Sequence, residues 1–130
     1  MTPTAIGTLL LLCGPPCAGK TTVAKRLAAS RPAVRLSPDE WVADLGLDQR
    51  SDLRENVHPL QWALAQQIVL AGANVVVESG HWMGAERDTK RLWAREHDVS
   101  VELHYLDVPL AILLERARRR AEQGQPVLTR

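Results

Sequence analysis

The chain has 130 residues, a formal net charge of +1 and a hydrophobic content of 45%. A chain of this length can bury one hydrophobic core, so we expect a single domain over residues 1–130. Because the net charge is near zero, the charge alone gives no reason to expect a nucleic acid or a membrane as partner. The sequence has no apolar stretch long enough to cross a bilayer, and its first apolar run lacks the basic leader of a signal peptide.

The two cysteines, Cys13 and Cys17, lie close together in one glycine-containing segment. A disulfide between them would distort that segment, so we expect reduced thiols and a cytoplasmic protein. Cys17 comes just before a predicted helix, where a thiol pKa tends to fall. Both a reactive thiol and a small loop residue fit this position.

The first predicted elements are a buried strand over Ile6–Cys13 and a helix over Lys20–Ser30. The segment between them fits the pattern G-x-x-x-x-G-K-[ST], and a second threonine, Thr22, follows it. Its residues are Gly14, Pro15, Pro16, Cys17, Ala18, Gly19, Lys20 and Thr21. A strand before this pattern and a helix after it form the context of a nucleoside-triphosphate site.

Each residue type in this segment has a chemical reason to be there. Gly14 and Gly19 permit backbone angles that turn successive N–H groups toward a phosphate. The start of the following helix adds unpaired N–H groups and the positive end of its dipole. Lys20 is expected to reach the β- and γ-phosphates, and the Thr21 hydroxyl to hold Mg²⁺.

The chain continues with a short strand over Ala33–Leu36 and a second helix that Gly46 ends. Ser37, Pro38 and Glu40 predict the start of that helix as a capping box. Residues 47–56 are polar and are expected to form a mobile connection. A third helix is predicted over Pro59–Ala71 and ends at Gly72; its expected inner face is Leu60, Leu64, Ile68 and Ala71.

The second half repeats the alternation of strands and helices. A strand at Val75–Val77, a helix over Ala85–His97, a strand over Val99–Leu106 and a helix over Pro109–Glu122 are expected. This alternation predicts an α/β fold with a parallel sheet and helices on both faces. In such a sheet the ligand site lies at the carboxyl ends of the strands.

Polar residues follow several of these strand ends. Asp39 could orient an acceptor hydroxyl as a general base, although an aspartate in a first helical turn is also favoured by the helix dipole. Glu78 could hold Mg²⁺ through water or contact the acceptor, or be a solvated strand end. His81 and Trp82 could contact the acceptor, or be a surface histidine and a buried tryptophan. Asp107 fits a helix cap best.

A basic cluster occupies the last helix: Arg116, Arg118, Arg119 and Arg120. The planar guanidinium donates paired hydrogen bonds to phosphate, so one or two of these residues could close over the γ-phosphate as a lid. A solvated basic helix end is the alternative. Arg87, on the fourth helix, is a further candidate for acceptor binding.

Taken in order, these pieces resemble the small P-loop kinases labelled AAA-type ATPases, which are related to zeta toxins, chloramphenicol phosphotransferase and polynucleotide kinase. The resemblance rests on residues 14–21, 37–41, 75–80, 85–87, 106–110 and 115–120. It implies that Asp39 engages the acceptor hydroxyl, that the lid lies around residues 112–130, and that Arg116 and Arg120 belong to it. It also implies a P-loop kinase sheet in the order 2-3-1-4.

Two departures from the family pattern affect the expected function. Polynucleotide kinases carry an arginine a few residues after the aspartate, and Val42 stands there in this chain. Relatives also continue past the lid into a fifth strand, so we expect a C-terminally truncated form whose exposed sheet edge pairs two copies as a homodimer.

From these observations we expect a phosphotransferase that uses ATP and Mg²⁺ to phosphorylate a hydroxyl of a small molecule. Lys20, Asp39, Arg116 and Arg120 are the expected catalytic residues. The alternative is a nucleotide-binding or ATPase module without an acceptor.

Overall fold

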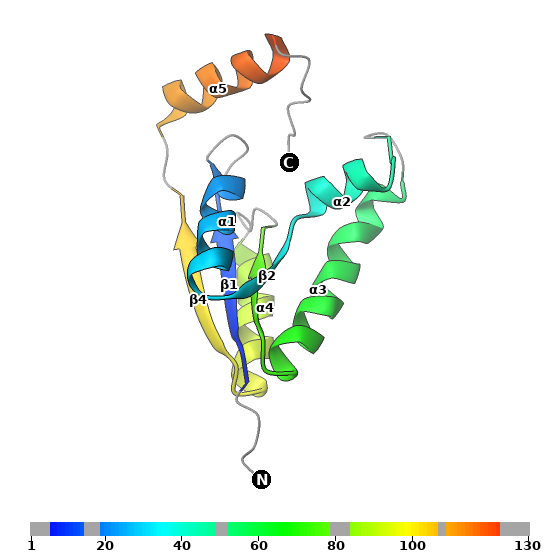
Figure 1. The fold of residues 1–130 in the computed structure, drawn as a ribbon, viewed down its shortest axis with the longest axis vertical. Helices are drawn as coiled ribbons and strands as arrows, with labels where there is room; N and C mark the ends of the chain where they lie inside the picture. The colour runs from blue at the N-terminus through cyan, green and yellow to red at the C-terminus, as the bar shows by residue number, and fades with distance from the viewer. Residues whose placement is uncertain (1–5, 15–18, 49–51, 79–83, 107–108, 123–130) are drawn as a thin grey trace.

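The computed structural model describes residues 6–14, 19–48, 52–78, 84–106 and 109–122. Four parallel strands form one sheet in the order β2-β3-β1-β4, and helices cover both of its faces (Figure 1). This arrangement confirms the predicted α/β class and the predicted strand order. Strands of a parallel sheet end at one edge, so the segments that follow them are brought together there.

The first half of the chain follows the predicted boundaries closely. Strand β1 spans Thr8–Cys13, α1 spans Lys20–Ser30, β2 spans Ala33–Leu36 and α2 spans Pro38–Asp44. The Ser37 hydroxyl accepts a hydrogen bond from the backbone N–H of Glu40, which is the expected cap of α2. Only this half of the predicted capping box forms, because the Glu40 carboxylate instead pairs with Arg35.

Helix α3 spans Arg54–Leu70 and corrects the prediction for the third helix in two ways. It begins before Pro59, which lies inside it, so part of the predicted mobile connection is helical. Its buried face consists of Val57, Gln61, Ala65 and Val69. Of the predicted inner face, Leu64 and Ile68 pack against the core, whereas Ala71 is exposed and Leu60 is 63% exposed. Extending the helix to Val57 buries another apolar side chain, and packing against the sheet outweighs the local preference of proline for a helix start.

The second half contains β3 (Asn74–Val77), α4 (Gly84–Glu96), β4 (Ser100–Tyr105) and α5 (Leu110–Glu122). Strand β1 pairs in parallel with β3 on one side and with β4 on the other. In the described sheet β4 is therefore an edge strand, and it exposes Leu103 and Tyr105. Figure 1 shows α5 lying across the carboxyl end of the sheet, above α1.

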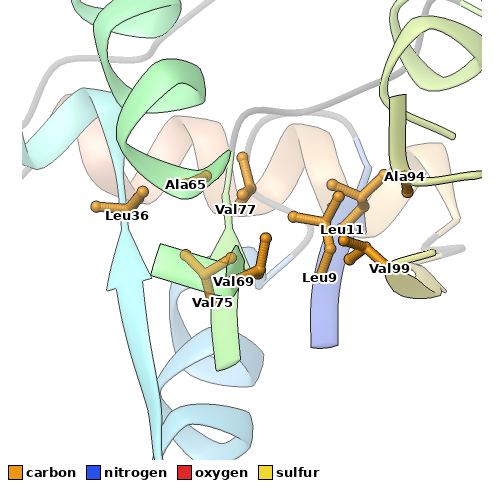
Figure 2. Packing of buried hydrophobic residues seen from close by; sticks show 9 residues of the cluster. All are labelled: Leu9, Leu11, Leu36, Ala65, Val69, Val75, Val77, Ala94 and Val99. Carbon is orange, nitrogen blue, oxygen red and sulfur yellow. The ribbon is translucent and has the colours of Figure 1, made fainter. Parts of the chain in front are cut away.

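Alternate residues of the central strands point into two separate cores. Leu9, Leu11, Val75 and Val77 face α3 and α4, where Ala65, Val69 and Ala94 pack on them (Figure 2). Leu10, Leu12 and Val76 face α1 and contact Ala24. Because both faces of β1 and β3 are covered, these strands are continuously apolar, as buried parallel strands usually are.

Gly7, before β1, allows the chain to approach the turn that precedes β3. A Cβ at this position would lie 1.8 Å from the carbonyl oxygen of Ala73, so no side chain fits there. The Gly7 N–H also donates to the carbonyl of Val69 at 2.8 Å. Within the described residues, no helix combines the length and the apolar character that crossing a membrane requires.

Candidate active site

The predicted phosphate-binding segment joins the end of β1 to the start of α1. Gly14 is buried directly after β1, and Gly19 adopts the left-handed region with φ 96°. Pro15, Pro16, Cys17 and Ala18 lie outside the described residues. The left-handed Gly19 is where the segment turns into the helix, and a residue with a side chain adopts such a φ only with strain.

The start of α1 differs from the start of α2 in its capping. No side chain caps the helix at Gly19, and the first turn, which holds Lys20, Thr21 and Thr22, contains no acidic residue. Helix α2 shows the usual alternative, with Ser37 as its cap and Asp39 and Glu40 in its first turn. A helix start without a side-chain cap or an acidic residue, with a lysine as its first residue, suits an anionic ligand such as a triphosphate.

A hydrogen-bonded chain connects α1 to two strands on the α1 side of the sheet. The Thr21 hydroxyl donates to Oε1 of Glu78 at 2.5 Å, and Arg35 Nη1 donates to Oε2 of Glu78 at 2.8 Å. The other guanidinium nitrogen of Arg35 pairs with Glu40. The Glu78 side chain is only 3% exposed, so its charge is held away from water and needs these partners.

The electrostatics of Arg35 agree with a structural pairing. Burial lowers the pKa of its guanidinium, but hydrogen bonds to Glu78 and Glu40 outweigh burial and leave that pKa above its ordinary value. Arg35 therefore stays charged and fixes both oxygens of the Glu78 carboxylate together with Thr21. Arg35 was not among the residues predicted from the sequence, although a charged residue in a short apolar strand was a usable signal.

Thr21 and Glu78 were the residues expected to hold Mg²⁺, and their arrangement fits that metal. Mg²⁺ binds hard oxygen ligands, keeps several waters and takes only one or two protein groups directly. A hydroxyl in contact with a fixed carboxylate provides one direct oxygen ligand and one acceptor for metal-bound water. The described residues contain no group of three or more histidine, cysteine and acidic side chains that would indicate a different, all-protein metal site.

Asp39 lies in the first turn of α2, directly beyond the carboxyl end of β2, and its side chain is partly buried. Glu78 lies directly beyond the end of the neighbouring strand β3. Parallel strands therefore bring Asp39 to the same edge of the sheet as the Thr21–Glu78–Arg35 chain. His81 and Trp82, the other predicted acceptor contacts at this edge, lie outside the described residues, as does Asp107.

Arg87, in the first turns of α4, lies next to the end of β1. Burial raises the pKa of the Cys13 thiol, while the charge of Arg87 and a hydrogen bond between the two side chains oppose that rise. Lys20 and Arg91 oppose it through their charges as well. Three cations therefore lie near the last residue of β1, immediately before the phosphate-binding segment. Cys13 is buried and has no disulfide, as expected.

The arginines of α5 separate into two groups. Arg118 and Arg119 pair with Glu115 on their own helix, and Arg118 also pairs with Glu122. Arg116 instead points toward the phosphate-binding segment, since its Nη1 lies 3.9 Å from where a Cβ of Gly19 would be. Arg120 is partly buried one turn further along. Of the four, Arg116 is thus the one brought to the start of α1.

Comparison with known proteins identifies the family of the chain. The family model of an AAA domain matches residues 9–129, nearly the whole chain. The chain belongs to this AAA domain family. No curated protein matches the sequence significantly.

Several proteins of known structure share the fold of this chain. A protein of Chloroflexus aurantiacus described as a kinase has a TM-score of 0.77 at 21% identity, covering 94% of this chain and 71% of its own. The Mycobacterium tuberculosis APS kinase, in complex with AMPPNP and APS, has a TM-score of 0.71 at 19% identity, with coverages of 97% and 84%.

The Pnkp1/Rnl/Hen1 RNA repair complex contains a third similar chain, with a TM-score of 0.75 at 19% identity. That match covers 98% of this chain but 42% of the other. The three similarities confirm the predicted resemblance to small P-loop kinases at the level of the fold.

Proposed function

We propose that this protein is an ATP- and Mg²⁺-dependent kinase that transfers the γ-phosphoryl group of ATP to a hydroxyl of a small molecule. The observation that carries the proposal is the Thr21–Glu78–Arg35 chain, which fixes a hydroxyl and a carboxylate beside an uncapped helix start. A glycine-rich turn that bound nothing would have no need of a buried carboxylate held in this way.

In the proposed reaction the acceptor oxygen attacks the γ-phosphorus in line with the bond to the β-phosphate bridging oxygen. The new P–O bond forms as that bond breaks, and ADP leaves with the electron pair. Asp39 accepts the proton of the acceptor hydroxyl, which is the role of a general base. The N–H groups of α1 and the ammonium of Lys20 hold the phosphates, and Arg116 stabilises charge on the transferred group.

Thr21 and Glu78 are the residues that would hold Mg²⁺, Thr21 directly and Glu78 through water. The metal would neutralise charge shared by the β- and γ-phosphates. Arg35 acts through another residue, because its guanidinium donates to Glu78 and thereby orients that carboxylate.

A small-molecule acceptor is favoured over a polynucleotide by Val42. This residue stands where a phosphate-binding arginine would be expected in polynucleotide kinases, and it is buried, so its side chain offers the acceptor no charge. The second candidate function is an ATPase module without an acceptor. It is favoured by the open phosphate site alone, which needs no acceptor to bind or slowly hydrolyse ATP.

The test is a screen of ADP release from Mg-ATP against a metabolite library that includes a 5′-hydroxyl oligonucleotide, with Asp39→Asn as the control. The proposal predicts that at least one small hydroxyl compound raises ADP release in the wild type and leaves the variant at its basal rate. Stimulation only by the oligonucleotide would contradict the small-molecule acceptor. ATP turnover that no compound raises would favour the ATPase module.

A further inference from the structure

Two buried polar side chains on neighbouring helices have no part in the mechanism above. Gln61 on α3 is 0% exposed, and within the described part of the chain neither its amide nitrogen nor its amide oxygen has a hydrogen-bond partner. Lys90 on α4 is 5% exposed, and its ammonium lies 5.3 Å from the centre of the Trp62 ring. Trp62 contacts Trp93 of α4, so the two polar side chains lie on helices that cover the same face of the sheet.

Both groups would be replaced by apolar residues if stability alone determined them. The other buried residues of α3 are Val57, Ala65 and Val69, and a leucine would fit this series better than an amide without partners. Burial also lowers the pKa of Lys90, and the charge of the nearby Glu86 opposes this effect without cancelling it. Among the described residues no carboxylate lies within ion-pair distance of Lys90, whose ammonium instead lies over the ring of Trp62.

The topology places both groups at the ligand edge of the sheet. Ala65 packs beside Leu36 and Val77, the last residues of β2 and β3 (Figure 2). Val69 packs one turn nearer the start of the strands, where its carbonyl accepts from Gly7. Gln61 lies one helical turn, about 5.4 Å, from Ala65 toward the carboxyl ends of the strands. It therefore reaches the level where Glu78 follows β3.

Lys90 reaches the same edge from α4. Lys90 lies near Cys13, the last residue of β1. Arg87 lies one turn earlier on α4 and is also close to Cys13. The α3–α4 side of this edge therefore carries an amide and a cluster of cations, while the α1 side carries Thr21 and Glu78.

We propose that Gln61 and Lys90 form the inner wall of the acceptor site, and that the acceptor is a hydroxylated anion. Its carboxylate, sulfate or phosphate group binds Lys90 with support from Arg87, and a neighbouring hydroxyl pairs with the amide of Gln61. This inference rests on the proposed kinase function and specifies the substrate class of that same site. Both side chains are covered, so the acceptor must part the ends of α3 and α4 to reach them.

The chemistry of the two groups supports this substrate class. An ammonium without a carboxylate partner gains most from an anion, because a neutral ligand leaves its charge uncompensated at a buried position. A primary amide offers both donors and an acceptor, which matches a hydroxyl better than a second anionic group. A purely apolar acceptor would satisfy neither residue.

The experiment compares binding of matched pairs of probes to the full chain with Mg-ADP present. The pairs are gluconate with glucose, and glycerol 3-phosphate with glycerol; sulfate and phosphate ions are added alone. Calorimetry is run on the wild type, on Gln61→Leu and on Lys90→Met. Exposed residues provide the controls, Gln67→Leu on α3 and Lys25→Met on α1.

We expect at least one acidic probe to bind the wild type, with its neutral counterpart at least about tenfold weaker. Lys90→Met and Gln61→Leu should each weaken the acidic probe by about tenfold or more. They should unfold at the same temperature as the wild type or a higher one and keep its affinity for ATP. The two controls should bind the probe as the wild type does.

Equal binding of acids and neutral compounds, or wild-type binding by Lys90→Met, would overturn the proposal. A lowered unfolding temperature in Gln61→Leu and Lys90→Met would assign both residues a structural role and overturn it as well. If no acid binds but the wild type binds ATP through Lys20, the anionic acceptor is wrong while the kinase proposal stands. If ATP does not bind either, the proposed function itself fails.

Discussion

Removing the guanidinium of Arg35 should lower the free energy of unfolding far more than removing the guanidinium of an exposed arginine. Arg35→Met keeps the length of the side chain but leaves Glu78, whose side chain is 3% exposed, without its charged partner. Breaking a fully buried ion pair costs about 3–5 kcal/mol, because the remaining charge stays desolvated. Arg35 itself is 18% exposed, so we expect about 2–4 kcal/mol.

This loss is a large part of the stability of a small domain, which is usually about 5–15 kcal/mol. Urea unfolding followed by tryptophan fluorescence would measure it, since the chain has four tryptophans. Glu78→Gln and the double variant complete a cycle, in which the double variant should lose about 1–3 kcal/mol less than the two single losses added together.

Arg118→Met on α5 is the matched control. Arg118 also pairs with two carboxylates, but its side chain is 57% exposed and its partners are exposed as well. Its loss should therefore change the unfolding free energy much less than the loss of Arg35. Equal effects of the two substitutions, or strict additivity of Arg35→Met and Glu78→Gln, would show that Glu78 does not depend on Arg35.

Three further predictions follow from individual contacts. Ser37→Ala should destabilise the protein by about 1 kcal/mol through the lost cap of α2. Asp39→Asn should leave the free energy of unfolding and the ATP affinity unchanged but remove transfer to the acceptor. If Asp39→Asn lowers stability without removing transfer, Asp39 is a structural residue. Gly7→Ala should prevent folding or cost several degrees in Tm, because its Cβ would overlap the Ala73 carbonyl; an unchanged Tm would mean that this approach is looser. Strand β4 should pair two copies at the sheet edge, and Tyr105→Lys should weaken that association in light scattering; a wild type that stays monomeric at every concentration would refute it.

The parts of the fold that depend on short segments could be predicted from the sequence. Val75–Val77 has no polar residue and is β-branched, which only a strand covered on both faces explains well. The boundaries of α1 and β2 followed from Gly19 and from the polar segments around them. Ser37 was likewise recognisable as a cap from its position before Pro38.

The buried face of α3 was predicted only in part, since Leu64 and Ile68 pack against the core but Leu60 does not. Leu60 and Leu64 make a reasonable helical stripe, so a count of apolar residues selects them. The structure turns the helix so that Gln61 is buried and Leu60 is exposed. A polar residue at a buried position contradicts the pattern on which such predictions rest, and contradictions of this kind are expected at functional sites.

The pairing of Arg35 with Glu78 was also out of reach, since the two residues are 43 positions apart. Their contact depends on β2 and β3 being neighbours and in a particular register, with Leu36 opposite Val77. A strand order alone does not give that register. The approach of Arg116 to Gly19 depends in the same way on where α5 lies across the sheet edge.

Calorimetric titration of Mg-ATP into the wild type and Lys20→Ala tests the nucleotide site most directly. The wild type should bind one ATP per chain. The variant should keep the fold, shown by an unchanged circular dichroism spectrum, but lose about 2–5 kcal/mol of binding free energy, roughly 30-fold or more in Kd. A folded Lys20→Ala that binds ATP as tightly as the wild type would contradict the assignment of residues 14–21 as a phosphate-binding segment and the kinase function proposed from it.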